Sequence, residues 1–327
     1  MRRARIIGTG MAVPARVLTN AELEKMVDTT DEWITSRTGI KERRIAAADE
    51  KLSDFALPAC RQALEMAGMA GSEVELVICA TVSPDQPFPA TACLIQDAIG
   101  APRAPAFDLS AACTGFVYGV GIAAQFLHSG WARTALVVGG EILSKIVDWT
   151  DRATCVLFGD GAGAVLLRAE EDGDRGVLSV AMHADGSYGD LIERPGGGSL
   201  HPPSRRNLDQ GLDFIKMKGN ETFKVAVRSL AQVSEQALGA AGLSPQDVDW
   251  FIPHQANRRI IDAIGERLAI RDGRTYVNIE RYGNTSAASV PIALDELNRA
   301  GRIAESDVVL MSAFGSGLTW GACVVRW

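Results

Sequence analysis

The sequence lacks the marks of several protein classes. Its six cysteines are scattered at positions 60, 79, 93, 113, 155 and 323 with no CxxC pair. This argues against a disulfide framework or a zinc site and favours a reducing, cytoplasmic setting. No apolar run reaches the ~18 residues of a membrane span, and the N-terminus has no apolar segment typical of a signal peptide. The formal charge of −7 argues against a nucleic-acid-binding protein.

The remaining composition is that of a globular α/β protein. The chain has 327 residues, of which 47% are hydrophobic and 22% charged, and its length predicts about two domain-sized units. Short apolar runs with the character of strands alternate with segments of helical periodicity. This alternation predicts the α/β class.

The chain repeats itself. Residues 63–81 align without gaps with residues 237–255 and are identical at six of nineteen positions, and GAVLLR (163–168) resembles GACVVR (321–326). We therefore predict a duplicated fold with one half in residues 1–170 and the other in residues 171–327.

Cys113 is the candidate nucleophile. It follows a strand-like run and a Ser-Ala-Ala turn, and it precedes a helix of small and apolar residues that reaches Leu127. A free thiol is only about 3% ionised at pH 7. A helix N-terminus stabilises a thiolate by up to ~2 kcal/mol, so we expect the pKa of Cys113 to be depressed. The alternative is a small residue that only packs the start of a buried helix.

Two further residues join the thiol through the repeat. Cys113-Thr114-Gly115 corresponds to Asn284-Thr285-Ser286, so Cys113 and Asn284 are predicted to occupy equivalent helix starts that face each other. His254 follows a strand end in the second half and can reach the same place. A papain-like protease would need its cysteine in a characteristic context near the N-terminus, which is absent here.

The constellation and its flanking segments resemble the ketoacyl synthase III family of the thiolase superfamily, over nearly the whole chain. The resemblance implies a thiolase-like fold layered αβαβα with two mixed five-stranded sheets, a homodimer, and no prosthetic group. Its motifs are DTTDEWITSRTGI (28–40), SAACTGF (110–116), FGDGAGAVLL (158–167), HADGSYGD (183–190), KMKGNETFKVAV (216–227), PHQANRR (253–259), YGNTSAASVPIAL (282–294) and FGSGLTWGA (314–322).

The resemblance implies a decarboxylative condensation. Cys113 would take an acyl group from acyl-CoA, and malonyl on acyl carrier protein would then lose CO2. His254 and Asn284 would stabilise the resulting enolate. The main-chain N–H groups of Cys113 and Ser316 would hold the second oxyanion. The family commonly has glycine where Ser316 stands, but a main-chain donor survives that change.

The resemblance also implies substrate contacts. Those for CoA and pantetheine are Thr29, Trp33, Arg37, Arg152, Asn220 and Asn257. The acyl pocket would consist of Leu157 and Phe158, with Phe88 contributed by the partner subunit. A basic patch for the acidic carrier protein would consist of Lys224, Arg258, Arg259 and Arg267. Plain packing of Trp33 and Phe88, and solvated helix faces for the basic residues, are the alternatives.

The leading hypothesis is therefore an acyltransferase that condenses a short acyl-CoA, acetyl-CoA first among them, with malonyl-acyl carrier protein to begin type II fatty-acid synthesis. A relative that uses another primer or acceptor in specialised metabolism is the second hypothesis. A non-catalytic partner in a multienzyme assembly is the third, and it predicts the loss of Cys113, His254 or Asn284, all of which are present.

Overall fold

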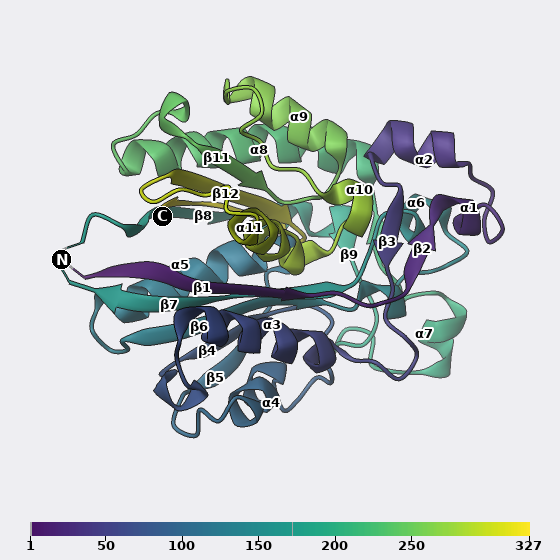
Figure 1. Ribbon diagram of the computed structural model, residues 1–327. Coiled ribbons are helices and arrows are strands. Elements are labelled where there is room, and N and C mark those ends of the chain that lie inside the picture. The colour runs from purple at the N-terminus through teal and green to yellow at the C-terminus, as the bar shows by residue number, and fades with distance from the viewer. Residues whose placement is uncertain (1, 172) are drawn as a thin grey trace.

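The computed structural model describes residues 2–171 and 173–327 and has five layers, helix–sheet–helix–sheet–helix (Figure 1). The first sheet has the strand order β1-β7-β6-β4-β5 and the second has the order β11-β12-β13-β8. The first consists of β1 (Arg3–Ala12), β7 (Gly161–Glu170), β6 (Thr134–Glu141), β4 (Val77–Ala80) and β5 (Ala106–Leu109). The second consists of β11 (Trp250–Pro253), β12 (Val308–Gly315), β13 (Thr319–Arg326) and β8 (Gly176–Ala184).

Both sheets are mixed. Strands β4, β5 and β6 run parallel to one another, while β7 is antiparallel to both β6 and β1. In the second sheet β11 and β12 are parallel, and β13 is antiparallel to β12 and β8. Every residue of β4, β6, β11 and β12 is buried. Parallel strands covered on both faces read as continuous apolar runs, which is why these segments were recognisable in the sequence.

Two buried helices separate the sheets, and four cover the outer faces (Figure 1). The central pair is α5 (Gly115–His128) and α11 (Ser289–Arg299), and the outer helices are α3 (Leu52–Ala67), α4 (Thr91–Ala98), α8 (Gly219–Ala240) and α9 (Arg258–Arg267). The small residues of α5 let it approach the first sheet. A Cβ at Gly119 would lie 2.9 Å from a methyl group of Val137 on β6.

The duplication is confirmed. The order β1-β7-β6-β4 in the first sheet is matched by β8-β13-β12-β11 in the second. The repeated hexapeptides lie in β7 and β13. Within the described residues the second sheet has four strands, not the expected five. The counterpart of β5 is reduced to an isolated bridge between Phe251 and Thr275.

The predicted equivalence of Cys113 and Asn284 is wrong. Ala112 has a φ of 46° and begins a 3-10 turn that leads into α5, while Ser286 has a φ of 49° and begins the turn that leads into α11. These two strained residues set the true register. Ala287 therefore corresponds to Cys113, and Asn284 lies before the turn.

Short elements surround the end of the sheets where β5, β6 and β11 finish (Figure 1). They are β2 (Val17–Thr19), α1 (Asn20–Leu23), α2 (Asp31–Thr38), β3 (Glu42–Arg44), α6 (Arg152–Cys155), β9 (Ile192–Glu193), α7 (Arg205–Asp209), β10 (Lys216–Met217) and α10 (Ile279–Tyr282). None of the helices in the described part of the chain is long and apolar enough to cross a membrane.

Candidate active site

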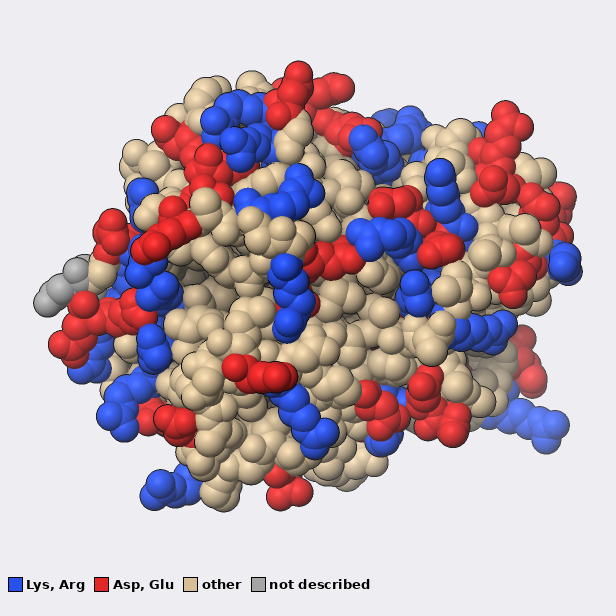
Figure 2. Space-filling model, viewed as in Figure 1, with Lys and Arg blue, Asp and Glu red and all other residues tan. Residues whose placement is uncertain are grey.

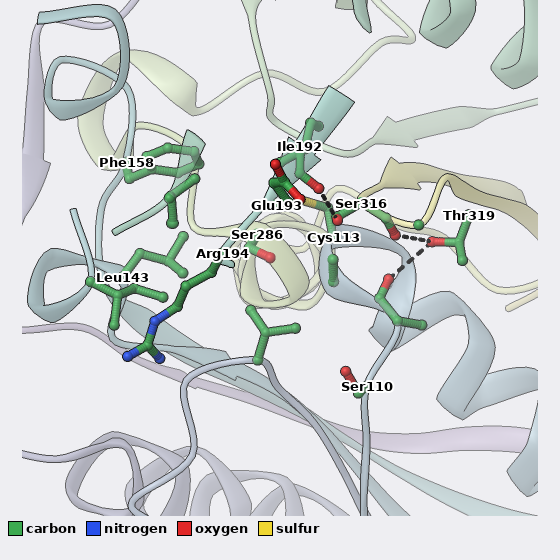
Figure 3. A pocket seen from close by; sticks show the side chains of 16 residues that line it. Ser110, Cys113, Leu143, Phe158, Ile192, Glu193, Arg194, Ser286, Ser316 and Thr319 are labelled. Carbon is green, nitrogen blue, oxygen red and sulfur yellow. Dashed lines mark hydrogen bonds between the residues drawn. The ribbon is translucent and has the colours of Figure 1, made fainter. Parts of the chain in front are cut away.

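Cys113 lies in the 3-10 turn Ala112–Thr114 between β5 and α5. Hydroxyl contacts tie this turn to Thr319, the first residue of β13. Thr114 donates its O–H to the carbonyl of Thr319 (3.0 Å), and the Thr319 hydroxyl donates to the carbonyl of Ala111 (3.1 Å). The thiol is partly buried at a cavity of about 380 Å³ whose wall includes Leu143, Phe158, Ile192, Ser286 and Ser316 (Figure 3).

The expected depression of the thiol pKa is not found. Burial raises the pKa of Cys113 to about 12, and a contact with the Ser286 hydroxyl opposes this shift only in part. The nearby carboxylate of Glu141 also raises the pKa. Desolvation of the thiolate outweighs the benefit of a helix start, because the turn lies deep between the sheets. The resting thiol is therefore neutral and needs a proton acceptor.

His254 follows β11, and only 3% of its surface is exposed. Its Nδ1 lies 2.6 Å from Oγ of Ser289 on α11, and the main-chain N–H of Gln255 donates to the same oxygen (3.3 Å). Burial lowers the pKa of His254 to about 3. The imidazole is therefore neutral at physiological pH and suited to donate a hydrogen bond from the nitrogen that does not face Ser289.

Asn284 precedes α11, and 7% of its surface is exposed. Its Oδ1 accepts the main-chain N–H of Ser286 (2.9 Å), which leaves the Nδ2 donors for another partner. Its own main-chain N–H donates to the carbonyl of Leu157 (2.9 Å), and an isolated bridge joins it to Phe158. The preceding Gly283 has a φ of 63°, and a Cβ there would lie 2.8 Å from the Leu157 carbonyl. Glycine is therefore required for this close approach.

The three predicted catalytic residues meet at one cavity. Cys113, His254 and Asn284 all line a cavity of about 510 Å³ that adjoins the first at Cys113 and Phe158. Of the predicted substrate-contact residues, the same cavity is lined by Trp33, Arg37, Leu157, Phe158, Asn220, Lys224, Asn257 and Arg259. Residues from both halves of the chain thus form one channel toward the thiol.

The outer end of this channel is built on α2. Thr30 caps this helix by accepting the main-chain N–H of Trp33 (3.1 Å). The guanidinium groups of Arg37 and Arg152 lie 4.9 Å and 5.2 Å from the centre of the Trp33 ring. This arrangement presents a flat aromatic surface with two cations, which suits a nucleotide base and its phosphates.

Asn257 and Thr29 do not belong to the cluster of Trp33 and its two arginines. The Asn257 amide donates to the carbonyl of Arg37 (3.0 Å), and its Oδ1 accepts the main-chain N–H of Arg259 (2.9 Å), so it joins α2 to the start of α9. Thr29 is half-buried and lines neither of these two cavities.

Only part of the predicted basic patch lies at the channel. Lys224 and Arg259 line it, whereas Arg258 forms an ion pair with Asp262 (2.8 Å) and Arg267 is exposed in the last turn of α9. On the face shown in Figure 2, basic and acidic side chains are interspersed. Of these four residues, Lys224 and Arg259 are therefore the two that place positive charge at the channel.

Ser316 lies at the same cavity as Cys113, and its predicted role as an oxyanion donor stays a prediction. It follows Gly315 and lines the same cavity as Cys113, and its hydroxyl donates to the carbonyl of Ile192 (Figure 3). Gly315 packs against the nucleophile turn, because a Cβ there would lie 2.7 Å from the main-chain nitrogen of Cys113. Phe88, in contrast, is 84% exposed and lines neither the cavity of about 380 Å³ nor the cavity of about 510 Å³.

Sequence reasoning missed three polar residues around the site: Glu141, Ser286 and Ser289. Glu141 ends the buried strand β6 and is itself fully buried. A carboxylate that closes a continuous apolar run is a signal that could have been noticed. The two serines belong to the motif that contains Asn284, and their roles emerge only from their partners in space.

Two family models match the chain: "3-oxoacyl-(acyl-carrier-protein) synthase III" over residues 107–186 and the C-terminal part of the same family over residues 238–327. The beta-ketoacyl-(acyl-carrier-protein) synthase III of Desulfitobacterium hafniense is 54% identical, covering 98% of this chain and 97% of the relative.

Solved structures agree with these matches. The 3-oxoacyl-(acyl-carrier-protein) synthase III of Aquifex aeolicus is 48% identical with a TM-score of 0.92, covering 99% of this chain and 100% of that one. A priming β-ketosynthase from a polyketide biosynthetic pathway is 36% identical with a TM-score of 0.92, covering 99% and 97%.

Proposed function

Since the chain belongs to the 3-oxoacyl-(acyl-carrier-protein) synthase III family, we propose how its residues carry out the condensation that initiates fatty-acid synthesis. The protein is an acyltransferase of the condensing type. It joins a short acyl group from acyl-CoA, acetyl in the first instance, to malonyl-acyl carrier protein. The observation that supports the assignment most is the convergence of Cys113, His254 and Asn284 on one cavity.

The first half-reaction loads the thiol. The Trp33 ring and the Arg152 guanidinium hold the CoA adenine, Arg37 binds a CoA phosphate, and Thr29 belongs to the same segment. The pantetheine arm follows the channel past Asn220 and Asn257. The thiolate of Cys113 attacks the thioester carbonyl, and CoA leaves as its thiol after protonation. The acyl group occupies the space beside Leu157 and Phe158. Phe88 completes this pocket from a second copy of the chain in a homodimer.

The second half-reaction forms the carbon–carbon bond. Malonyl-acyl carrier protein enters by the same channel, drawn by Lys224 and Arg259, with Arg258 and Arg267 at the edge of the docking surface. The malonyl carboxylate departs as CO2, and the enolate oxygen accepts hydrogen bonds from His254 Nε2–H and Asn284 Nδ2–H. Ser289 donates its O–H to Nδ1 of His254, which keeps the ring proton on Nε2.

The carbanion then attacks the acyl-cysteine. The main-chain N–H groups of Cys113 and Ser316 hold the oxyanion that forms there, and its collapse releases 3-ketoacyl-acyl carrier protein and the Cys113 thiolate. These steps use a thiol, an imidazole, an amide and main-chain donors, and they call for no prosthetic group. The cytoplasmic setting stays a prediction.

The function is tested by incubating the protein with a panel of acyl-CoAs and measuring its intact mass. We expect one acyl adduct on the wild type, strongest with acetyl-CoA, and none on Cys113→Ala. Adding malonyl-acyl carrier protein should discharge the adduct as ketoacyl product. An adduct that persists in Cys113→Ala would sink the nucleophile assignment.

A second candidate function is priming in specialised metabolism, which the similarity to the polyketide priming β-ketosynthase favours. Strong acylation by a longer or branched acyl-CoA, with weak acylation by acetyl-CoA, would support that function instead.

A further inference from the structure

Glu141 is a fully buried carboxylate that the condensation steps leave without a task. Four groups donate hydrogen bonds to it. They are the hydroxyls of Thr81 (3.2 Å), Ser83 (2.5 Å) and Ser286 (3.2 Å) and the main-chain N–H of Val82 (3.2 Å). Within residues 2–171 and 173–327, no lysine or arginine forms a salt bridge with it. Burying a carboxylate whose partners are only hydroxyls and one N–H lowers the stability of the fold. A functional role would account for its presence.

Ser286 connects this carboxylate to the nucleophile. Its O–H donates to Glu141 Oε1 (3.2 Å). The 3-10 turn of Ser286 packs against the 3-10 turn of Cys113, and the Ser286 hydroxyl lowers the pKa of the Cys113 thiol. The main chain of Ser286 is fixed at this point. Its φ is 49°, and its N–H donates to Asn284 Oδ1. Cys113 and Ser286 both line the cavity shown in Figure 3.

His254 is poorly suited to accept the proton of the thiol. Burial lowers the pKa of His254 to about 3, and its Nδ1 faces Ser289. Burial raises the pKa of Glu141 to about 7, which is near the pH at which a general base is most effective.

The other titratable groups around Glu141 do not compete for this role. Burial raises the pKa of the Cys79 thiol well above its ordinary value, so this thiol stays neutral. The carboxylates on neighbouring elements accept main-chain N–H groups elsewhere: Asp85 from Ser53, Asp108 from Thr91, and Asp160 from Ala46.

We propose that Glu141 receives the proton of Cys113 through the hydroxyl of Ser286 during acylation, an inference that rests on the proposed function of the thiol. The S–H proton passes to Ser286 Oγ as the Ser286 proton passes to Glu141 Oε1. The products are a thiolate, an unchanged serine and a neutral carboxylic acid. The thiolate then displaces CoA, which takes a proton from solvent. When condensation releases the Cys113 thiolate, the proton returns by the reverse route.

In this scheme Ser286 touches the reacting atom, and Glu141 acts through it. The experiment therefore follows the thiol directly. It measures the pH dependence of Cys113 alkylation by iodoacetamide, and separately the rate of acylation by acetyl-CoA from intact mass in a quenched-flow instrument. The variants are Ser286→Ala and Glu141→Gln. Thr81→Val is the matched control, because it also removes a 3.2 Å hydroxyl contact to Glu141 but lies off the relay.

The relay predicts that Ser286→Ala and Glu141→Gln slow acylation about 10²-fold at pH 7. Their alkylation rates should rise only at higher pH than in the wild type. Thr81→Val should shift the pH profile only slightly to higher pH, because its hydroxyl lowers the pKa of Glu141, and it should leave the relay itself working. If Glu141 acted only as a like charge beside the thiol, its removal would lower the thiol pKa, and Glu141→Gln would be alkylated faster. Faster or unchanged reaction in either relay variant overturns the proposal.

Two controls keep the result interpretable. Thermal unfolding reports whether Glu141→Gln is folded, because its amide faces four donors. If it is not, Ser286→Ala, which removes a single oxygen atom, decides the question. Alkylation needs no acyl substrate. Failure of the relay is therefore seen as an unchanged alkylation profile, whereas failure of the proposed function is seen as a wild-type protein that no acyl-CoA acylates.

Discussion

Replacing Gly315 by alanine tests the main-chain donor at the nucleophile. Gly315 is the last residue of β12 and precedes Ser316. A Cβ at this position would lie 2.7 Å from the main-chain nitrogen of Cys113 and 3.1 Å from that of Thr114, where both neighbours are backbone atoms that cannot swing aside. The methyl group would therefore occupy the approach to the Cys113 N–H, which the thioester oxygen needs.

Two effects of this substitution have different sizes. Loss of one oxyanion donor slows turnover by about 10²–10³-fold, or ~2.7–4 kcal/mol of barrier. Forcing a methyl group into a packed interior destabilises a fold by ~1–3 kcal/mol. A typical protein has ~5–15 kcal/mol of stability, so Gly315→Ala should fold at 25 °C but be nearly inactive.

Quenched-flow acylation by acetyl-CoA and steady-state condensation with malonyl-acyl carrier protein measure the loss. Gly239→Ala is the matched control, because a Cβ there meets open space on the surface of α8. The control should keep full activity and gain ~0.5–1 kcal/mol of stability, as a helical glycine-to-alanine change does. Wild-type acylation and condensation rates in a folded Gly315→Ala protein would refute the assigned donor.

Three further outcomes are expected. In the folded state the pKa of His254 is about 3, whereas in the unfolded chain it is about 6.5. The unfolded chain therefore binds a proton that the folded protein does not, and the free energy of unfolding falls as the pH is lowered from 6.5 to 3. The loss is about 1.4 kcal/mol per pH unit well below 6.5, and urea unfolding should show a shallower acid loss in His254→Gln; parallel slopes would contradict the reasoning. Trp33→Ala should raise the KM for acetyl-CoA about 2–30-fold with kcat unchanged, because it removes stacking worth ~0.5–2 kcal/mol. The KM for acetyl-pantetheine should not change, since that substrate lacks the adenine, and an equal effect on both substrates would argue against the contact. Ser289→Ala should slow condensation about 2–10-fold, because it removes the hydrogen bond to His254 Nδ1, worth ~0.5–1.5 kcal/mol. Acylation, followed by intact mass, should not change, and its loss would instead make His254 the base for Cys113.

The sequence by itself determined the fold class and the family, and it singled out the candidate reacting groups. Continuous apolar runs such as β4 and β6 indicate strands that are covered on both faces, and such runs can be recognised from the local sequence alone. The helix over residues 52–67 ends where Gly68 adopts a φ of 63°, a left-handed conformation that glycine adopts without a steric penalty. Cys113, His254 and Asn284 stand in local motifs that the sequence shows directly.

Tertiary structure alone decided how those groups behave. The Ser286–Glu141 contact joins residues 145 positions apart, and the Ser289–His254 contact joins residues 35 apart. No local pattern encodes such pairs. The pKa of Cys113 moved opposite to the expectation because desolvation sums over every element that packs around the thiol, whereas a helix start is a local feature. The register of the two helix starts likewise depended on which residues adopt a positive φ, and the surrounding sheets enforce that strain at Ala112 and Ser286.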